Sequence, residues 1–379
     1  FALDITDPQS PQFLWRINRV NDAPLFGLPA GAAPDHVIPV LGQTWSEPAF
    51  ALVRTSDGDE TGTPVFFIGA GYTPDNSAGK AILAIKVSDG SVLRVWRNGV
   101  SGISDMDYAI PGGVTVVDED DNGFADKLYV GDIGGQLWRI GKFTDDEGEP
   151  LPFPGADENS MNWEAHIFFF AGIPGEARSS RKFFFPPSVT LEKGYDLLFI
   201  GTGDVEDPCN PTSSDRIYAI KDANGPGTLT ELDLVNITTL PHRVPDLDVD
   251  QGWYLPLPPG EKVLAKGLVF NRVYYVTSFA PNISGETATL YGLNYKTGEP
   301  ALFGETFPHT PKRSMEIGTS IPSGPVAVIT KAGQKIVVSK TLRTPPSERA
   351  SRGALEAGIL AINPTFPPVN FFYLWWMQH

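Results

Sequence analysis

The sequence predicts an all-β fold of the β-propeller kind, and three observations support this. Helix signals are weak, because 39 glycines and 35 prolines are spread through 379 residues and no long 3.6-residue apolar period occurs. Short β-branched and aromatic runs, bounded by Gly, Pro, Asp and Asn, dominate instead, which is typical of strands. The same succession of strands also recurs along the chain, which indicates a repeat architecture.

The repeat has two recognisable elements. The first is an apolar strand that usually ends in Gly: VFFIGAG (65–71), KLYVGD (127–132), LLFIGTGD (197–204), with weaker copies VYYVTS (273–278) and KIVVSK (335–340). The second lies downstream of each: AILAIKVSDG (81–90), GQLWRIGKF (135–143), RIYAIKDANG (216–225), TLYGLNYKTG (289–298) and GILAINP (358–364), with a further copy in FALDITDP (1–8). A run that often carries Trp follows: FLWRI (13–17), VLRVW (92–96) and FFYLWW (371–376).

These elements fit blades of four strands, and each blade spans roughly 55 to 80 residues. The chain supplies five full blades and the last two strands of another, so the first blade is incomplete and the parent ring is expected to hold about six to seven. Residues 1–379 are interpreted as a single propeller domain, the C-terminal part of a longer protein, because the chain begins within a strand and shows no signal sequence. A β-sandwich array is the alternative. Longer connections are expected at 204–215, from the 240s to 259, and at 341–357.

Composition excludes several functions. The net charge is −16 and the isoelectric point is about 4.7, which disfavours nucleic-acid binding, since phosphate contacts need clustered Lys and Arg. A single cysteine, Cys209, excludes a disulfide framework and a zinc site built from several thiolates. No apolar run approaches the length of a membrane span, so no span is expected.

The segment DEDDNGFAD, residues 118–126, is the candidate metal site. Oxygen ligands alternate in the order of an EF-hand-like calcium loop: side chains of Asp118, Asp120 and Asn122, then the backbone carbonyl of Phe124, then Asp126. Five carboxylates in nine residues repel one another unless a cation neutralises them. A hard divalent ion does this, so Ca²⁺ is the predicted cofactor. The alternative is an acidic hairpin turn, since Asp, Asn and Gly are common turn residues.

The loop departs from a twelve-residue EF-hand at its end. Gly123 stands at the sixth position, where the loop must turn sharply. Tyr129 stands where the usual closing glutamate would be, so Asp126 must provide the last contact. Glu119 and Asp121 are expected to alternate outward and not to bind the ion.

Other candidate sites are weaker. The histidines show no metal-ligand spacing, and no motif of a common enzyme class occurs, so no catalytic residue is assigned. Asp246, Asp248 and Asp250 alternate and could hold a second cation, but a solvated acidic loop is favoured because no turn Gly lies among them. A quinoprotein dehydrogenase is the enzyme alternative, although its usual adjacent-cysteine disulfide cannot form here. A non-catalytic acidic interaction scaffold is the third reading.

The order of these motifs resembles the C-terminal propeller of the PilY/PilC-type tip proteins of type IV pili. The resemblance runs over most of the chain and is most specific in IPGGVTVVDEDDNGFADKLYVGDIGGQLWRI, where the acidic loop, the strand, Gly-Asp and Leu-Trp-Arg follow in fixed order. Other shared strings are FALDITDP, TWSEPAF, LLFIGTGD and DQGWYLPLPPGEKV. The family's calcium ligands match Asp118, Asp120, Asn122, the Phe124 carbonyl and Asp126.

The resemblance implies a non-enzymatic, calcium-binding surface factor that is secreted through the periplasm. It would act at the pilus tip or outer membrane of a bacterium, support pilus biogenesis, oppose retraction and take part in adhesion and twitching motility. Its expected partners are pilin or minor pilin subunits and a host or surface ligand.

Overall fold

The computed structural model describes residues 1–19, 35–55, 60–100, 103–141, 163–172, 180–238, 243–281, 286–304, 307–331, 333–342 and 356–362. Regular structure in these ranges is β, apart from one 3₁₀ turn, η1 (Glu231–Asp233). The all-β prediction is confirmed. Within the same ranges, no helix is long and apolar enough to cross a membrane.

In the described residues the strands form seven sheets. Six of them follow one another along the chain and are numbered here in that order, and the seventh is a two-stranded pair that is given with sheet 6. Sheet 1 contains β1 (Ala2–Asp4), β2 (Gln12–Asn18) and β3 (Asp35–Val37). Sheet 2 contains β4 (Ala49–Val53), β5 (Thr63–Gly69), β6 (Ala81–Lys86) and β7 (Val92–Arg97). Sheet 3 contains β8 (Thr115–Val117), β9 (Lys127–Gly131), β10 (Gln136–Gly141) and β11 (Ala165–Phe170), with β15 (Leu229–Thr230) added alongside β11.

The later sheets follow the same order. Sheet 4 contains β12 (Ser188–Glu192), β13 (Tyr195–Gly201), β14 (Arg216–Asp222) and β17 (Gly252–Pro256), with β16 (Val235–Asn236) added. Sheet 5 contains β18 (Lys262–Val263), β19 (Leu268–Phe270), β20 (Val273–Ala280), β21 (Thr287–Asn294) and β24 (Ser314–Gly318). Sheet 6 contains β25 (Val326–Thr330), β26 (Gly333–Leu342) and β27 (Glu356–Ile362), and β22 (Leu302–Gly304) pairs with β23 (Phe307–Lys312).

The repeat read from the sequence maps onto these sheets. The Gly-ended runs are the second strands β5, β9 and β13, and the downstream elements are the third strands β6, β10, β14, β21 and β27. The expected fourth strand of sheet 6, at 371–376, lies outside the described residues, as does most of the connection at 341–357. One expected boundary was wrong: the connection placed from the 240s to 259 contains β17, the fourth strand of sheet 4.

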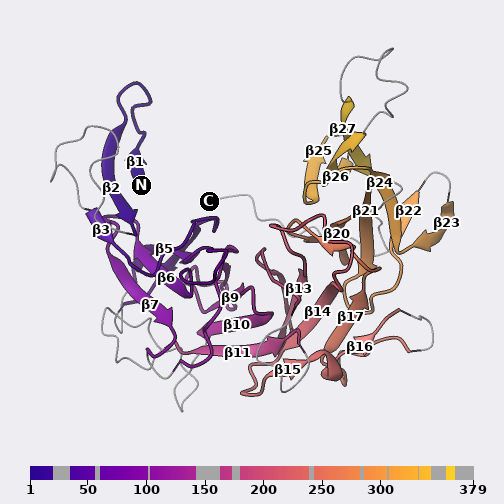
Figure 1. Ribbon diagram of the computed structural model, residues 1–379, viewed down its shortest axis with the longest axis horizontal. Helices are drawn as coiled ribbons and strands as arrows, with labels where there is room; N and C mark the ends of the chain where they lie inside the picture. The colour runs from indigo at the N-terminus through magenta and orange to yellow at the C-terminus, as the bar shows by residue number, and fades with distance from the viewer. Residues whose placement is uncertain are drawn as a thin grey trace.

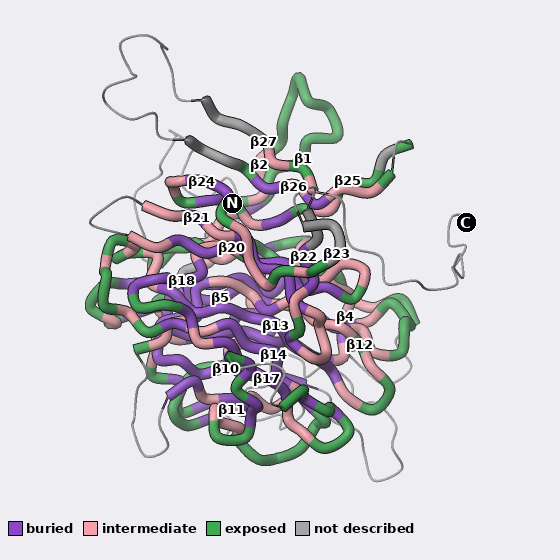
Figure 2. The backbone as a smooth tube through the Cα atoms, turned by 90° about the vertical axis from the view of Figure 1, so that its right-hand side faces the viewer, coloured by how far each residue is buried: buried purple, intermediate pink, exposed green. Residues whose placement is uncertain are grey.

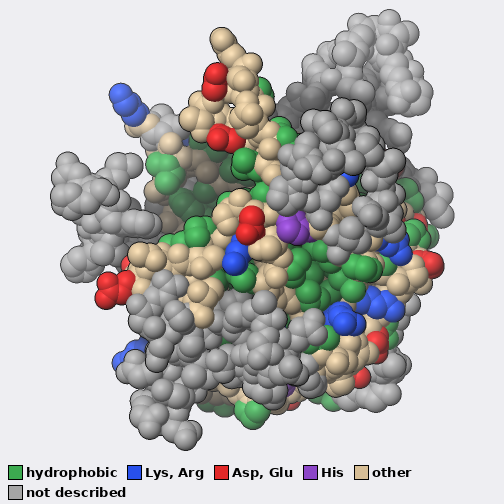
Figure 3. Space-filling view, turned by 90° about the vertical axis from the view of Figure 1, so that its left-hand side faces the viewer, with side chains coloured by type: hydrophobic (Ala, Val, Ile, Leu, Met, Phe, Trp, Pro, Cys, Tyr) green, Lys and Arg blue, Asp and Glu red, His purple; other side chains and the backbone are tan. Residues whose placement is uncertain are grey.

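The sheets follow one another around an arc from β1 to β27 (Figure 1). The first strands β4, β8, β12, β19 and β25 contact one another in succession, which places them on the inner side of the arc. The second and third strands lie in the middle of the sheets, and Figure 2 shows them as a buried layer beneath exposed turns. Figure 3 views the molecule from the side of sheets 1 and 2 and shows hydrophobic side chains gathered on that face.

Tryptophans fasten neighbouring sheets together. Trp15, Trp96 and Trp253 lie on β2 of sheet 1, β7 of sheet 2 and β17 of sheet 4, and each is at most 6% exposed. Each indole Nε1 donates a hydrogen bond to a backbone carbonyl of the following sheet. The acceptors are Val87 at 3.0 Å, Trp163 at 2.9 Å and Tyr295 at 3.2 Å. These buried indoles therefore have both packing and polar partners.

The repeated Gly has a packing reason. A Cβ on Gly131 would lie 2.3 Å from the Cβ of Phe183, which precedes the next sheet. Gly69 and Gly201 are equally tight, with Ile110 O and Val263 Cγ2 each 2.4 Å away. None of the three has a positive φ. Close approach of the next sheet therefore explains this part of the repeat.

Candidate metal centre

The acidic loop joins the first two strands of sheet 3. β8 ends at Val117 and β9 begins at Lys127, and these two residues are register partners in an antiparallel pair. The Asp126 amide donates to the Val117 carbonyl at 2.9 Å, which closes the loop at its base. Tyr129 lies within β9, so Asp126 is the last carboxylate that the loop can offer.

The structure brings together three of the predicted ligands. One carboxylate oxygen each from Asp118, Asp120 and Asp126 lies within 4.8 Å of the others. Asp118 and Asp126 are half-buried and Asp120 is exposed. Among the described residues, this is the one group of three or more acidic, His or Cys side chains whose ligand atoms converge in this way.

Backbone amides hold the carboxylates in place. Asp118 accepts from the amides of Asn122 at 3.1 Å and Gly123 at 2.7 Å. Asp126 accepts from the amide of Glu119 at 2.6 Å. Gly123 has φ +89°, the left-handed conformation that favours glycine at a sharp turn. The loop is therefore shaped around converging oxygens by its own main chain.

Asn122 and Phe124 lie beside this group. The Asn122 side-chain amide donates to Asp120 at 2.7 Å, and its oxygen accepts from the Phe124 amide at 2.8 Å. The Phe124 ring lies under the Arg54 guanidinium, 4.3 Å from the ring centroid. The next amide, Ala125, donates to Leu52 of β4 at 2.9 Å. The loop is thus fastened to sheet 2, and the ligand roles of Asn122 and the Phe124 carbonyl stay predictions.

Electrostatics leave the loop short of positive charge. Burial raises the pKa of the Asp126 carboxyl, the Glu119 amide hydrogen bond lowers it, and the charges of Asp120 and Asp118 raise it further. A carboxyl in this position is stabilised in its charged form by a nearby cation. The arrangement suits a hard cation that takes oxygen ligands.

The expectation that Glu119 points outward was wrong. Its side chain is 16% exposed and forms an ion pair with Lys127, whose side chain is fully buried. Asp121 is exposed and has φ +58°. The signal for Lys127 was a charged residue at the start of the apolar run KLYVG, and sequence reasoning did not use it.

The second acidic segment does not gather in the same way. Arg243 forms an ion pair with Asp250, and the Asp246 amide donates to Asp250 at 2.9 Å. Asp248 is exposed and its amide is bonded to Asp246. The Arg243 side chain therefore neutralises part of the negative charge of this segment. This is consistent with the solvated acidic loop that the sequence favours over a second cation site.

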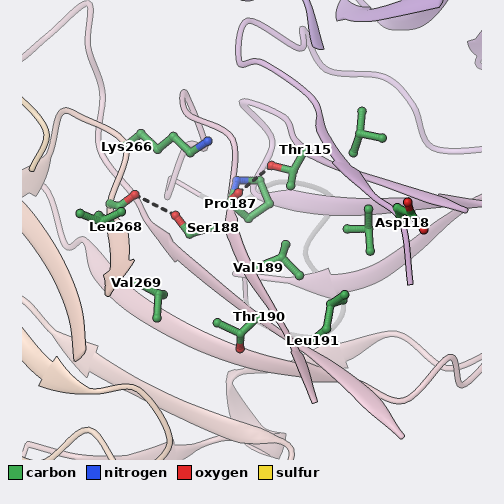
Figure 4. A pocket seen from close by; sticks show the side chains of 13 residues that line it. Thr115, Asp118, Pro187, Ser188, Val189, Thr190, Leu191, Lys266, Leu268 and Val269 are labelled. Carbon is green, nitrogen blue, oxygen red and sulfur yellow. Dashed lines mark hydrogen bonds between the residues drawn. The ribbon is translucent and has the colours of Figure 1, made fainter. Parts of the chain in front are cut away.

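A cavity opens beside the loop on the inner side of the arc. Its volume is about 450 Å³, and it is lined by residues of β8, β12 and β19 and their flanking turns. Figure 4 shows Asp118 at one edge and Lys266 at another, with Val189 and Leu268 on the walls. The Thr115 and Ser188 hydroxyls are bonded to the carbonyls of Pro187 and Gly267.

Successive, mainly antiparallel sheets with their first strands on the inside define a β-propeller architecture. A comparison with known protein families finds no matching family model. The crystal structure of the Pseudomonas aeruginosa PilY1 C-terminal domain has the same fold, with a TM-score of 0.61 and 18% sequence identity over 88% of this chain and 76% of that one. The propeller prediction is confirmed, and the number of blades stays a prediction.

Curated proteins agree in sequence. A type IV pilus biogenesis factor PilY1 homolog from Xylella fastidiosa is 25% identical over 360 residues, covering 84% of this chain and 22% of that protein. The type IV pilus biogenesis factor PilY1 of P. aeruginosa is 27% identical over 214 residues, covering 54% of this chain and 16% of its own length. This chain therefore spans about a fifth of these relatives or less. The predicted resemblance to PilY/PilC-type proteins is confirmed.

Proposed function

We propose that this chain is a calcium-binding propeller that supports type IV pilus biogenesis by binding rather than by catalysis. The similarity to proteins named as PilY1 biogenesis factors supports the pilus role. The observation that carries the metal proposal is the convergence of Asp118, Asp120 and Asp126 within 4.8 Å in a partly buried loop.

Five groups would hold the ion. They are the side chains of Asp118, Asp120, Asn122 and Asp126 and the carbonyl of Phe124. The Asn122 oxygen must exchange its present bond to the Phe124 amide for the ion. Bound calcium supplies the countercharge that the acidic loop lacks. These oxygens are the kind of ligand that Ca²⁺ prefers, whereas softer metals favour thiolate or imidazole, which are missing from the five.

The proposed setting is the bacterial surface, at the pilus tip or outer membrane. The partners would be pilin or minor pilin subunits, together with a host or surface ligand. In that setting the protein opposes retraction and contributes to adhesion and twitching motility. The relatives are named as pilus biogenesis factors, which supports a non-enzymatic role over the quinoprotein alternative. An acidic scaffold indifferent to calcium is the remaining alternative.

Calcium titration by calorimetry tests the site with two variants of one loop. The parent chain is expected to bind one ion in the micromolar range typical of sensor loops. Asp126→Ala removes the closing ligand and should abolish binding. Asp121→Asn removes an exposed charge outside the ligand set, keeps a residue type that tolerates the positive φ of this position, and should leave affinity nearly unchanged. Equal affinity in the parent and Asp126→Ala would remove the loop from the site.

The pilus role is tested in the source bacterium. Deletion of the gene should reduce surface piliation. Restoring the parent gene should recover piliation, and restoring Asp126→Ala should recover less. Normal piliation in the deletion strain would refute the pilus role and leave the calorimetric result standing.

A further inference from the structure

Lys127 links the acidic loop to the neighbouring sheet. It is the first residue of β9, directly after Asp126, and its side chain is fully buried. Its Nζ pairs with Glu119 of the loop, lies 2.6 Å from Asp196 of β13 and donates to Asn224 at 3.0 Å. One ammonium group therefore joins the loop of sheet 3 to two side chains of sheet 4 and its turn.

On the loop side, Lys127 closes the base between the first and last carboxylates. Glu119 follows Asp118, and the Glu119 amide donates to the Asp126 carboxylate at 2.6 Å. The Glu119 side chain then reaches Lys127, which follows Asp126. The Lys127–Glu119 pair thus fixes the two chain ends that carry Asp118 and Asp126.

On the other side, the contact continues into sheet 4. The Tyr129 hydroxyl bonds Asp196 at 2.7 Å and Asp222 at 2.8 Å, and Arg139 bonds Asp222 at 2.7 Å. Three other junctions between sheets carry a tryptophan indole that donates a hydrogen bond to the following sheet. The junction of sheets 3 and 4 carries this buried charged network instead, next to the acidic loop.

We propose that Lys127 is a positioning residue of the metal loop and that, through it, calcium binding tightens the contact between sheets 3 and 4. The inference rests on the proposed calcium site. A buried ammonium must keep its partners, so it fixes Glu119 and Asp196 relative to each other. Groups that orient metal ligands from outside the ligand set typically change metal affinity about 10- to 100-fold.

The sign of the effect separates positioning from simple charge. By Coulomb's law alone, removing an ammonium near a divalent cation removes a repulsion and tightens calcium binding. If Lys127 positions the loop, removing it takes the ion pair away from Glu119, loosens Asp126 and weakens calcium binding. The two explanations predict opposite changes in the same measurement.

The test measures calcium affinity and thermal stability in parent, Lys127→Met and Lys262→Met. Lys262 is the matched control: it is also fully buried, and its Nζ donates to the carbonyls of Pro208, Asn210 and Gly260. Lys127→Met should weaken calcium binding about tenfold. Lys262→Met should lose stability and change calcium affinity by less than about twofold, as for distant sites.

Two milder variants test the positioning role of Lys127 if Lys127→Met does not fold. Glu119→Gln removes the loop side of the pair, and Asp196→Asn removes the sheet 4 side. Both should weaken calcium binding, a change that the lost negative charge alone would also give. The separating result is that Asp196→Asn should also reduce the rise in melting temperature that calcium produces, because coupling between two sites is reciprocal. Unchanged or tighter binding in the folded variants would overturn the positioning role. A parent chain that binds no calcium would instead refute the proposed function.

Discussion

At the scale of single residues, Asp126 combines two roles in one carboxylate. It is the last acidic side chain before β9, and it accepts the Glu119 amide that closes the loop. Its partial burial makes the charged form costly without a cation, while its backbone bond keeps it aimed at Asp118 and Asp120. In the proposed calcium site, this residue therefore links metal affinity to pH.

Calcium affinity should fall as pH falls from about 7.5 to about 5. The raised pKa of Asp126 means that protons compete for this carboxylate at a higher pH than for an ordinary aspartate. Since calcium needs the charged form, binding releases protons and weakens on acidification. Calorimetry at the two pH values measures the change.

Asp126→Asn provides the control for that pH series. It should bind more weakly at neutral pH and lose most of the dependence between the two values. A parent affinity that does not change over this interval would contradict the assignment of Asp126 as a ligand.

The place of the acidic loop and the convergence of Asp118, Asp120 and Asp126 could be predicted from sequence, because they follow from spacing alone: alternate oxygens, one turn glycine and a following strand. The Glu119–Lys127 pair could not, because its partner Asp196 is 69 residues away from Lys127. Alternation along the loop assigned Glu119 to solvent, and a long-range buried charge overrode that local rule.

At the scale of elements, the Gly-ended second strand shows how the repeat fits its neighbours. Gly131 ends β9 where Phe183 of the following segment approaches, so any side chain at this position would clash with Phe183. The position of the glycine was visible in the sequence, but its reason was not, because the contact belongs to the next sheet.

Gly131→Ala should therefore destabilise the fold. An added Cβ would lie 2.3 Å from that of Phe183, so the neighbouring segment must shift. Overpacking of this kind costs about 1–3 kcal/mol in unfolding free energy, measurable by urea denaturation. Gly227→Ala is the control, since its Cβ would meet nothing within 4 Å and its φ is not positive. Equal loss in both variants would contradict the packing explanation.

The same scale explains one missed strand. β17 contains Trp253 and Leu255 but also begins at Gly252 and ends at Pro256, and Asp-rich and Pro-rich segments flank it. Turn-forming composition on both sides hid a strand that pairs with β14 along its length. Long-range pairing, rather than local preference, decides its structure.

At the scale of the whole molecule, the two ends of the arc expose apolar side chains. Phe1 and Ile5 beside β1 are 75% and 65% exposed, and Val326 and Ile329 of β25 are 58% and 70% exposed. Large side chains of this kind, when grouped, mark surfaces that other chains can cover.

Ile329→Lys should therefore reduce self-association and the binding of an apolar dye by the purified chain. The added charge interrupts the apolar strand β25 without entering the core. Light scattering and dye fluorescence measure the change. Leu232→Lys serves as the control, because Leu232 is 82% exposed but lies alone in η1. A similar effect in both variants would argue against a surface specific to β25.

The tryptophan hydrogen bonds between sheets also set an order of assembly during synthesis. Trp15, Trp96 and Trp253 each donate to a carbonyl that lies later in the chain. When a ribosome makes the protein from its N-terminus, each of these sheets emerges before the segment that completes it. Such a sheet stays open at its edge until the next one has formed, so the arc is expected to close in the direction of translation.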